Sequence, residues 1–231
     1  MPEIPHTLSQ FEEGLKSTKK GILLMGSTAQ ENLSSAIQGL LTRNGDLCQS
    51  AIRDDKSVNE YEREIGEEGM EILTRFNPMA TDLRAVVGAM KIATNLERVS
   101  DEAEGIARRA IKLHKKGEAP EILLVEPVFR LAEALLEDAM RSYSDGDVEL
   151  ALTLHDRDQK LNELHRKTIK KLTRAMEANV ASLRIFLHCI FVVRCLERIG
   201  DHAVNIGEEV VYIHCAADIR HIGPEALTEQ E

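Results

Sequence analysis

Two pairs of carboxylates stand at helical spacing in this 231-residue chain, 100 residues apart from each other. Glu97 and Asp101 form the first pair, and Glu197 and Asp201 form the second. Residues four apart lie on the same side of an α-helix, so each pair presents two acidic side chains in one direction. Like charges at this spacing cost roughly 0.2–0.5 kcal/mol on an exposed helix, and more when burial removes water. A bound cation or a neighbouring arginine would offset this repulsion.

A second set of polar donors precedes each pair at the spacing i, i+4, i+7. The first set is Asp55, Asn59 and Glu62, and the second is Asp158, Asn162 and His165. If each set faces its carboxylate pair across a helix bundle, the two together form a site of the kind that holds iron, manganese or magnesium. An interhelical salt-bridge network with Arg98, Arg194 and Arg198 is one alternative, and a solvated acidic groove is the other.

The carboxylates interrupt apolar stripes and do not stand on a fully polar face. At 100° per residue, the stripe that begins at Leu183 continues to Glu197, Asp201 and Glu208. A second apolar stripe lies on another side of each helix, at Ile92, Val99, Ile106 and Leu113 and at Val192, Ile199, Ile206 and Ile213. Each helix therefore has two sides that favour burial. One would pack in its own bundle, and the other would meet the second bundle, a partner subunit or a ligand.

Hydrophobic periodicity and turn signals divide the chain into six long helices. They are expected at about Leu8–Thr42, Asp46–Phe76, Met79–Lys116, Glu121–Ser144, Asp147–Glu177 and Val180–Ala216. Asp46 and Asp147 are suitable N-caps for the helices that they begin, and Gly117 is a candidate C-cap.

The six helices form two sets of three, because short motifs recur at an offset near 100 residues. Besides the acidic pairs, Asp82-Leu-Arg84 is echoed by Ser182-Leu-Arg184. The sequence therefore predicts an all-α fold of two tandem, pseudo-symmetric three-helix bundles. Their expected ranges are residues 8–117 and 120–216, followed by a flexible tail at residues 217–231.

Composition narrows the function classes. A net charge of −10 argues against nucleic-acid binding, which needs a basic surface. The start of the chain does not resemble a signal peptide, no apolar run is long enough to span a bilayer, and the four cysteines form no C-x-x-C pair; a cytoplasmic protein is expected. No nucleophile elbow, phosphate loop or H-E-x-x-H motif is present, which favours a protein that is not an enzyme. His202 is expected to have a surface or packing role.

The segment Leu196-Glu-Arg-Ile-Gly-Asp-His-Ala-Val-Asn-Ile206 and the related Leu96-Glu-Arg-Val-Ser-Asp101 resemble the PhoU family of phosphate-uptake regulators. The residues around Asn59 and Asn162 match that family's second and fifth helices. The resemblance implies two three-helix bundles. It also implies E(D)-x-x-x-D motifs, which hold multinuclear iron or zinc clusters in some members and fall here on Glu97, Asp101, Glu197 and Asp201.

The first motif departs from the family pattern at three positions. Ser100, Glu102 and Gly105 stand where Gly, His and Asn are usual. The first site is therefore expected to be weaker than the second or to bind differently.

The resemblance further implies a cytoplasmic, usually dimeric adaptor that contacts the membrane only through its partners. These are the ATPase subunit of the phosphate-specific ABC transporter and the phosphate-sensing histidine kinase, and the adaptor damps phosphate uptake and the phosphate-starvation response. One alternative is a carboxylate-bundle metal-binding protein or metalloenzyme without a phosphate-signalling role, although the E-x-x-H ligand pairs of such enzymes are absent. A structural helical protein with ion-paired acidic stripes is the other.

Overall fold

The computed structural model describes residues 4–116 and 120–220, and within these ranges the chain is helical with no strand. The six long helices are α1 (Ile4–Thr42), α2 (Gly45–Phe76), α3 (Ala80–His114), α4 (Glu126–Asp145), α5 (Val148–Ala178) and α6 (Leu183–Cys215). Short 3₁₀ helices, η1 (Pro120–Val125) and η2 (Val180–Ser182), precede α4 and α6. The all-α prediction with six long helices is confirmed.

The helix starts differ from prediction at α1, α2, α4 and α6, and α1 begins at Ile4, four residues before the expected Leu8. Asn44, and not Asp46, caps α2: its side chain accepts hydrogen bonds from the backbone N–H groups of Asp46, at 2.9 Å, and Leu47, at 3.3 Å. The predicted starts of α4 and α6 are early because η1 and η2 fill those residues. Pro127 stands in the first turn of α4, where its missing N–H is harmless.

Two other caps were predicted, Asp147 at the start of α5 and Gly117 after α3. The N-cap at Asp147 is confirmed, because its carboxylate accepts a hydrogen bond from Leu150 N at 2.9 Å. Gly117, the candidate C-cap, lies outside the described residues.

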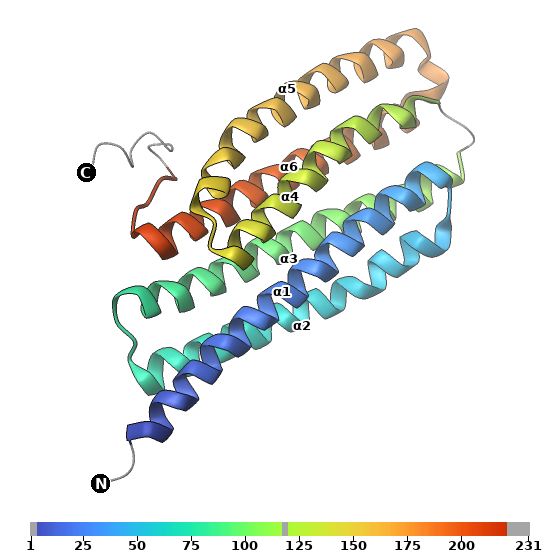
Figure 1. Ribbon diagram of the computed structural model, residues 1–231. Helices are drawn as coiled ribbons and strands as arrows, with labels where there is room; N and C mark the ends of the chain where they lie inside the picture. Colours follow the sequence, from blue (N-terminus) through green and yellow to red (C-terminus); the bar gives the residue numbers. More distant parts are fainter. Residues whose placement is uncertain (1–3, 117–119, 221–231) are drawn as a thin grey trace.

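Helices α1–α3 form one up-down-up bundle and α4–α6 form the other, and the bundles lie side by side with α3 and α6 in contact at the centre (Figure 1). α3 and α6 run antiparallel, and facing residues have numbers that add to about 300. Three contacts show this register: Lys91 with Glu209, Asn95 with Asn205, and Glu102 with Arg198. The repeat offset of 100 and this register together place a pseudo-twofold axis near Ser100 and Gly200.

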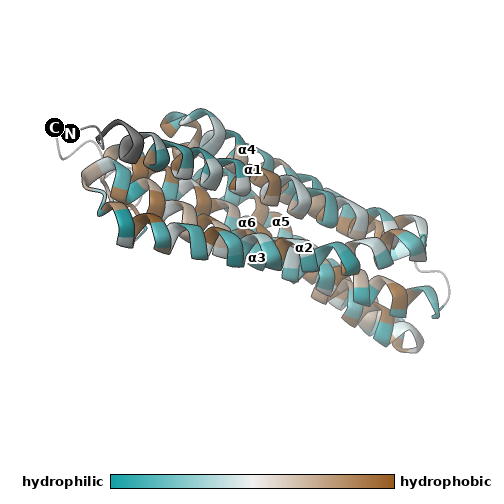
Figure 2. Cartoon of the chain, turned by 90° about the horizontal axis from the view of Figure 1, so that it is seen from below, coloured by the Kyte–Doolittle hydropathy of each residue, from teal (hydrophilic) through white to brown (hydrophobic). Residues whose placement is uncertain are grey.

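The second apolar stripes of α3 and α6 are buried in one core that is continuous across both bundles. This core contains Ile92, Val99, Ile106, Leu113, Val192, Ile199, Ile206 and Ile213. A Cβ atom on Gly88 of α3 would lie 2.6 Å from Ile213 of α6, so the two backbones approach closely there. The second side of each helix therefore serves the contact between bundles. Hydrophobic and hydrophilic segments alternate along every helix in Figure 2, as amphipathic packing requires.

The chain after α6 turns back onto the second bundle. Ile219 is buried and packs with Ala151, Val210 and Val211. The predicted flexible tail is thus packed over its first residues, whereas residues 221–231 lie outside the described ranges. No helix in the described part of the chain is long and apolar enough to cross a membrane.

Candidate functional site

The first acidic cluster lies where α2 meets α3, and its central carboxylate is already hydrogen-bonded on both oxygens. Asp55 is buried; its Oδ1 accepts from Ser100 Oγ at 2.8 Å and its Oδ2 accepts from Asn59 Nδ2 at 3.1 Å. Asn32 of α1 donates in turn to Ser100 Oγ at 3.2 Å. A chain of hydrogen bonds through all three helices therefore satisfies the polar groups at the centre of the first bundle.

Removing the Ser100 hydroxyl should destabilise the first bundle. Ser100→Ala leaves one oxygen of the buried Asp55 carboxylate without a donor, which costs about 1–3 kcal/mol. Urea unfolding would measure this. Ser142→Ala is a matched control, because Ser142 is equally buried but its hydroxyl donates only to Ala139 O of its own helix. Equal losses for the two variants would contradict the assigned role of Ser100.

The second acidic cluster lies at the equivalent place between α5 and α6, and its central carboxylate is left half satisfied. Asn162 Nδ2 donates to Asp158 Oδ2 at 2.6 Å, but Asp158 Oδ1 is buried and has no hydrogen-bond partner. Gly200 stands where the first bundle has Ser100. A Cβ atom there would lie 2.8 Å from Asp158 Oδ1 and 2.3 Å from Leu161 Cδ2, so a side chain that could supply the missing donor would require Leu161 and Asp158 to shift.

The arginines increase the difference between the clusters. Arg98 contacts both carboxylates of the first pair, with nitrogen–oxygen distances of 3.3 Å to Glu97 and 3.4 Å to Asp101. Its counterpart Arg198 instead pairs with Glu102 of α3 at 2.8 Å. The negative charge of the first cluster is therefore partly offset by its own arginine, whereas the carboxylates of the second form no ion pair within residues 4–116 and 120–220.

Crowding of carboxylates raises the pKa of several acids. Burial, then the charges of Glu197 and Asp158, raise the pKa of Asp201 to about 6, against a small opposing effect of Arg198. Burial and Glu197 also raise the pKa of Asp158. In the first cluster burial and Asp101 raise the pKa of Glu97. The carboxylates of the second cluster are thus close enough to repel one another.

The raised pKa of Asp201 predicts a stability that falls between about pH 4 and pH 6. In that window the folded protein holds a proton that the unfolded chain, with an ordinary pKa of 3.8, releases, so folding weakens as pH rises and then levels off. The Asp201 carboxyl group is crowded by neighbouring atoms, but the residue as a whole stays accessible to water, so solvent screening limits the effect to about 1 kcal/mol. Thermal unfolding with chelator at pH 5 and pH 7 should show a smaller difference for Asp201→Asn than for the wild type. Asp156→Asn is the control, because Asp156 is exposed and lies outside the cluster; it should show the same difference between pH 5 and pH 7 as the wild type. A wild-type difference in Asp201→Asn would contradict the assignment of this pH dependence to Asp201.

The remaining predicted donors are placed less closely. Glu62 accepts from Thr94 Oγ1 at 3.4 Å, at the edge of the first cluster, and the half-buried His165 has an Nε2 atom without a hydrogen-bond partner. Glu208 lies in a separate pocket with Lys91 and Arg220. In the side-chain positions of residues 4–116 and 120–220, no three His, Cys, Asp or Glu groups are arranged to hold a metal ion.

Two features of the clusters were not predicted from the sequence. The first is Asn32, which the sequence could have indicated because it is a polar residue at a core position of α1, between the buried Ala29 and Leu33. Leu135 lies beside Gly200 as Asn32 lies beside Ser100, so an apolar residue replaces the amide in the second bundle.

His202 has the packing role that was expected. It is half-buried, and its Nδ1 lies 3.1 Å from Asn95 Oδ1 across the contact between α3 and α6.

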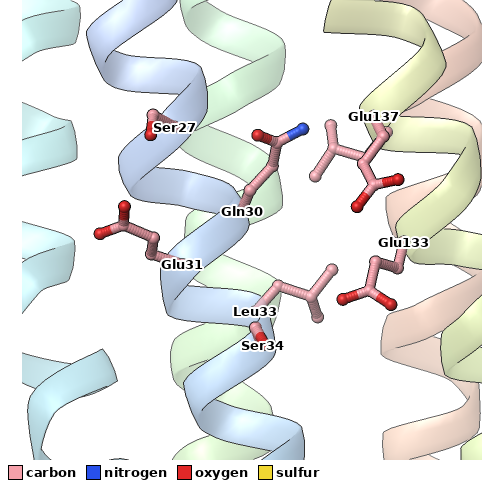
Figure 3. Close-up of a pocket in the computed structure, with 8 residues that line it drawn as sticks. Ser27, Gln30, Glu31, Leu33, Ser34, Glu133 and Glu137 are labelled. Atoms are coloured by element: carbon pink, nitrogen blue, oxygen red, sulfur yellow. The ribbon is translucent and has the colours of Figure 1, made fainter.

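A separate groove of about 330 Å³ runs between α1 and α4 (Figure 3). Glu31 stands on the α1 side and Glu133 and Glu137 on the α4 side. Arg130 pairs with Glu133 at 3.1 Å, so part of this acidic charge is balanced. None of the predicted site residues lines this groove.

Comparison with known proteins identifies the fold and the repeat. A model of the PhoU domain matches residues 22–110 and again residues 125–210. The phosphate-specific transport system accessory protein PhoU homolog of Pseudomonas aeruginosa is 32% identical over 226 residues, which cover 97% of this chain and 93% of that protein. The phosphate-specific transport system accessory protein PhoU of Escherichia coli is 29% identical over 222 residues, which cover 96% of this chain and 92% of that protein.

Solved structures agree with this. The crystal structure of PhoU from Pseudomonas aeruginosa superimposes with a TM-score of 0.87 at 31% identity, covering 90% of this chain and all of that one. The phosphate transport system regulatory protein PhoU from Streptococcus pneumoniae shares the fold, with a TM-score of 0.82 at 22% identity over 90% of this chain and 99% of that one. The relatives' names denote accessory and regulatory proteins, which points away from catalysis. Because the PhoU domain matches most of the chain in two successive copies, and relatives align along nearly all of it, the protein belongs to the PhoU family.

Proposed function

We propose that this protein is a negative regulator of phosphate uptake and of the phosphate-starvation response. The observation that carries this is the near-complete alignment with accessory proteins of the phosphate-specific transport system, at about 30% identity and over both PhoU domains. It acts in the cytoplasm as an adaptor without catalysis of its own. Its partners are the ATPase subunit of the phosphate ABC transporter and the phosphate-sensing histidine kinase, and it works as a homodimer; these details rest on the family resemblance.

The second acidic cluster is the part of the molecule best suited to a regulatory metal. Asp158 Oδ1 is buried without a partner beside Gly200, and Glu197 and Asp201 add further negative charge. Asn162 and His165 supply one amide and one imidazole. This oxygen-rich set with a single imidazole suits iron, manganese or magnesium better than zinc, which favours cysteine and several histidines.

A bound divalent cation would neutralise the mutual repulsion of these acids and join α5 to α6. The side chains of Glu197 and Asp201 would have to turn towards Asp158, because their present positions do not form a ligand set. The first cluster fits a metal less well, since Ser100 and Asn59 occupy the oxygens of Asp55 and Arg98 offsets part of the charge of the pair. Glu97, Asp101, Asp55 and Glu62 are therefore proposed as an ion-paired, hydrogen-bonded counterpart of the metal site.

Deleting the gene tests the proposed regulation. At high external phosphate, the deletion strain should take up phosphate faster and express phosphate-starvation genes that the parent represses. A plasmid copy of the wild-type gene should restore both. Uptake and expression that stay at the parental level after deletion would contradict the proposal, and the carboxylate-bundle metal protein without a phosphate role would then be favoured.

A further inference from the structure

The charge of this acidic protein is strongly polarised along the bundle. Residues 108–116 contain five Lys and Arg and no Asp or Glu, and residues 166–194 contain seven Lys and Arg and one Glu, in a chain with 29 basic and 39 acidic residues. The fold brings these stretches together, because the C-terminal ends of α3 and α5 and the N-terminal end of α6 lie at the same end of the molecule, on the right in Figure 1. We call this end of the molecule the basic end.

Key cations of the basic end are unpaired. Arg109, Lys112 and Lys116 form no ion pair among the described residues, although the neighbouring Arg108 pairs with Glu104 at 2.6 Å. Arg109 stacks on Phe191, with its guanidinium carbon 4.1 Å from the ring centroid, and its Nε is buried without an acceptor. His188 also has a buried Nδ1 atom without a partner, and burial together with Arg109, Lys116 and Lys112 lowers its pKa.

The pseudo-symmetric counterparts of Arg109 and Phe191 form an ion pair, so the basic end departs from the arrangement at the opposite end. The offset of 100 and the antiparallel register relate Arg109 and Phe191 to Glu209 and Lys91 at the other end. There, Lys91 Nζ pairs with the buried Glu209 at 3.1 Å. The basic end therefore has a cation where the opposite end has a buried carboxylate, and an aromatic ring where the opposite end has a lysine.

Exposed apolar side chains accompany these cations. Val180 of η2 is 72% exposed and Leu123 of η1 is 61% exposed. Leu183, Leu187 and Phe191 continue as an exposed ridge at spacing i, i+4, i+8 along the first turns of α6. Exposed apolar side chains and unpaired Lys and Arg at the same end of a molecule are the features by which a soluble surface binds an anionic bilayer, although Glu121 and Glu126 flank Leu123 and keep part of this end acidic.

We propose that the basic end docks directly onto an anionic lipid bilayer, with Leu123, Val180 and Leu183 entering the headgroup region and the exposed Lys112 and Lys116 contacting lipid phosphates. In this arrangement the protein lies on the membrane surface and does not span the bilayer. The inference goes beyond the proposed regulation and does not depend on it. Direct docking would hold the adaptor at the surface where a membrane transporter works.

Vesicle flotation with the full-length protein tests this. The protein should float with vesicles of phosphatidylcholine and phosphatidylglycerol, float little with phosphatidylcholine alone, and be released by high salt. Lys112→Glu combined with Lys116→Glu should weaken binding about a hundredfold or more. Leu123→Ser combined with Val180→Ser, at highly exposed positions where folding is not at stake, should weaken it about tenfold.

Lys16→Glu combined with Lys20→Glu is the matched control, because both are exposed lysines towards the other end of α1 and the change in net charge is the same. This control should bind as the wild type does. Failure of the wild type to float with anionic vesicles, or equal losses in the two lysine variants, would overturn the proposal. A different result would assign the basic end to protein binding: the wild type does not bind vesicles, but the Lys112 and Lys116 variant loses binding to the transporter's purified ATPase subunit or changes oligomeric state. In that case the basic end is a protein-docking surface and the lipid proposal is wrong.

Discussion

Replacing Asp201 with alanine is expected to weaken the binding of Mn²⁺ to the purified protein by at least about a hundredfold. Asp201 is one of three carboxylates that share the second cluster, where Asp158 Oδ1 has no partner and Arg198 is engaged by Glu102. Removing one carboxylate both deletes a ligand and lowers the negative potential that attracts the cation. Isothermal titration calorimetry on metal-free protein, repeated with Fe²⁺ under anaerobic conditions, would measure the loss.

Asp101→Ala is the matched control, because Asp101 occupies the equivalent position of the first repeat. It should leave Mn²⁺ affinity within about threefold of the wild type, since Ser100, Asn59 and Arg98 already satisfy that cluster. Equal losses in Asp101→Ala and Asp201→Ala would contradict the asymmetry between the repeats. Wild-type protein that binds none of Mn²⁺, Fe²⁺, Mg²⁺ and Zn²⁺ would rule out the metal proposal itself.

Lys91→Ala is expected to produce the largest loss of folding stability, about 2–3 kcal/mol. Lys91 Nζ lies 3.1 and 3.3 Å from the two carboxylate oxygens of Glu209, whose side chain is only 7% exposed. Removing the lysine leaves a buried carboxylate without its paired cation at the contact between the bundles. The partial exposure of Lys91 and the nearby guanidinium of Arg220 keep the loss below the 3–5 kcal/mol typical of fully buried pairs. Chemical denaturation monitored by circular dichroism would measure it.

A double variant distinguishes loss of the pair from loss of packing. Lys91→Met combined with Glu209→Gln removes both charges and keeps similar volumes, so it should recover most of the stability that Lys91→Ala loses. If the double variant is as unstable as Lys91→Ala, the uncompensated charge is not the cause.

Most of the fold follows from periodicity and turn chemistry. Asn77-Pro78 and Asp145-Gly146 end α2 and α4 where they were expected, because Pro excludes α geometry before it and Gly146 adopts the left-handed conformation that closes a helix. The choice of Asn44 over Asp46 as the cap of α2 was not predictable, since both residues are good caps. The tight turn after α1 decides it, by placing Asn44 in the extended conformation that a cap requires.

The pairs of helices that carry the candidate sites and a difference between the two sites could be expected from the sequence, but the contacts that produce the difference could not. Spacing suggested that Asp55 could face the first carboxylate pair and Asp158 the second, and the structure brings each near its pair. The inequality depends on whether the facing residue of α3 or α6 donates a hydrogen bond to the central carboxylate, and helical periodicity does not fix such contacts. The sequence did show Ser100 in place of Gly200, and the structure supplies the consequence: a hydroxyl donor for Asp55 and none for Asp158.

Phosphate uptake in a deletion strain that carries single variants is the most direct test of the link between the second cluster and regulation. Wild-type protein and Asp101→Ala should both restore low uptake at high external phosphate. Asp201→Ala, present at the same cellular level by immunoblot, should leave uptake as high as in the deletion strain. Restoration of low uptake by Asp201→Ala to the same extent as by Asp101→Ala would contradict a regulatory role for the second cluster.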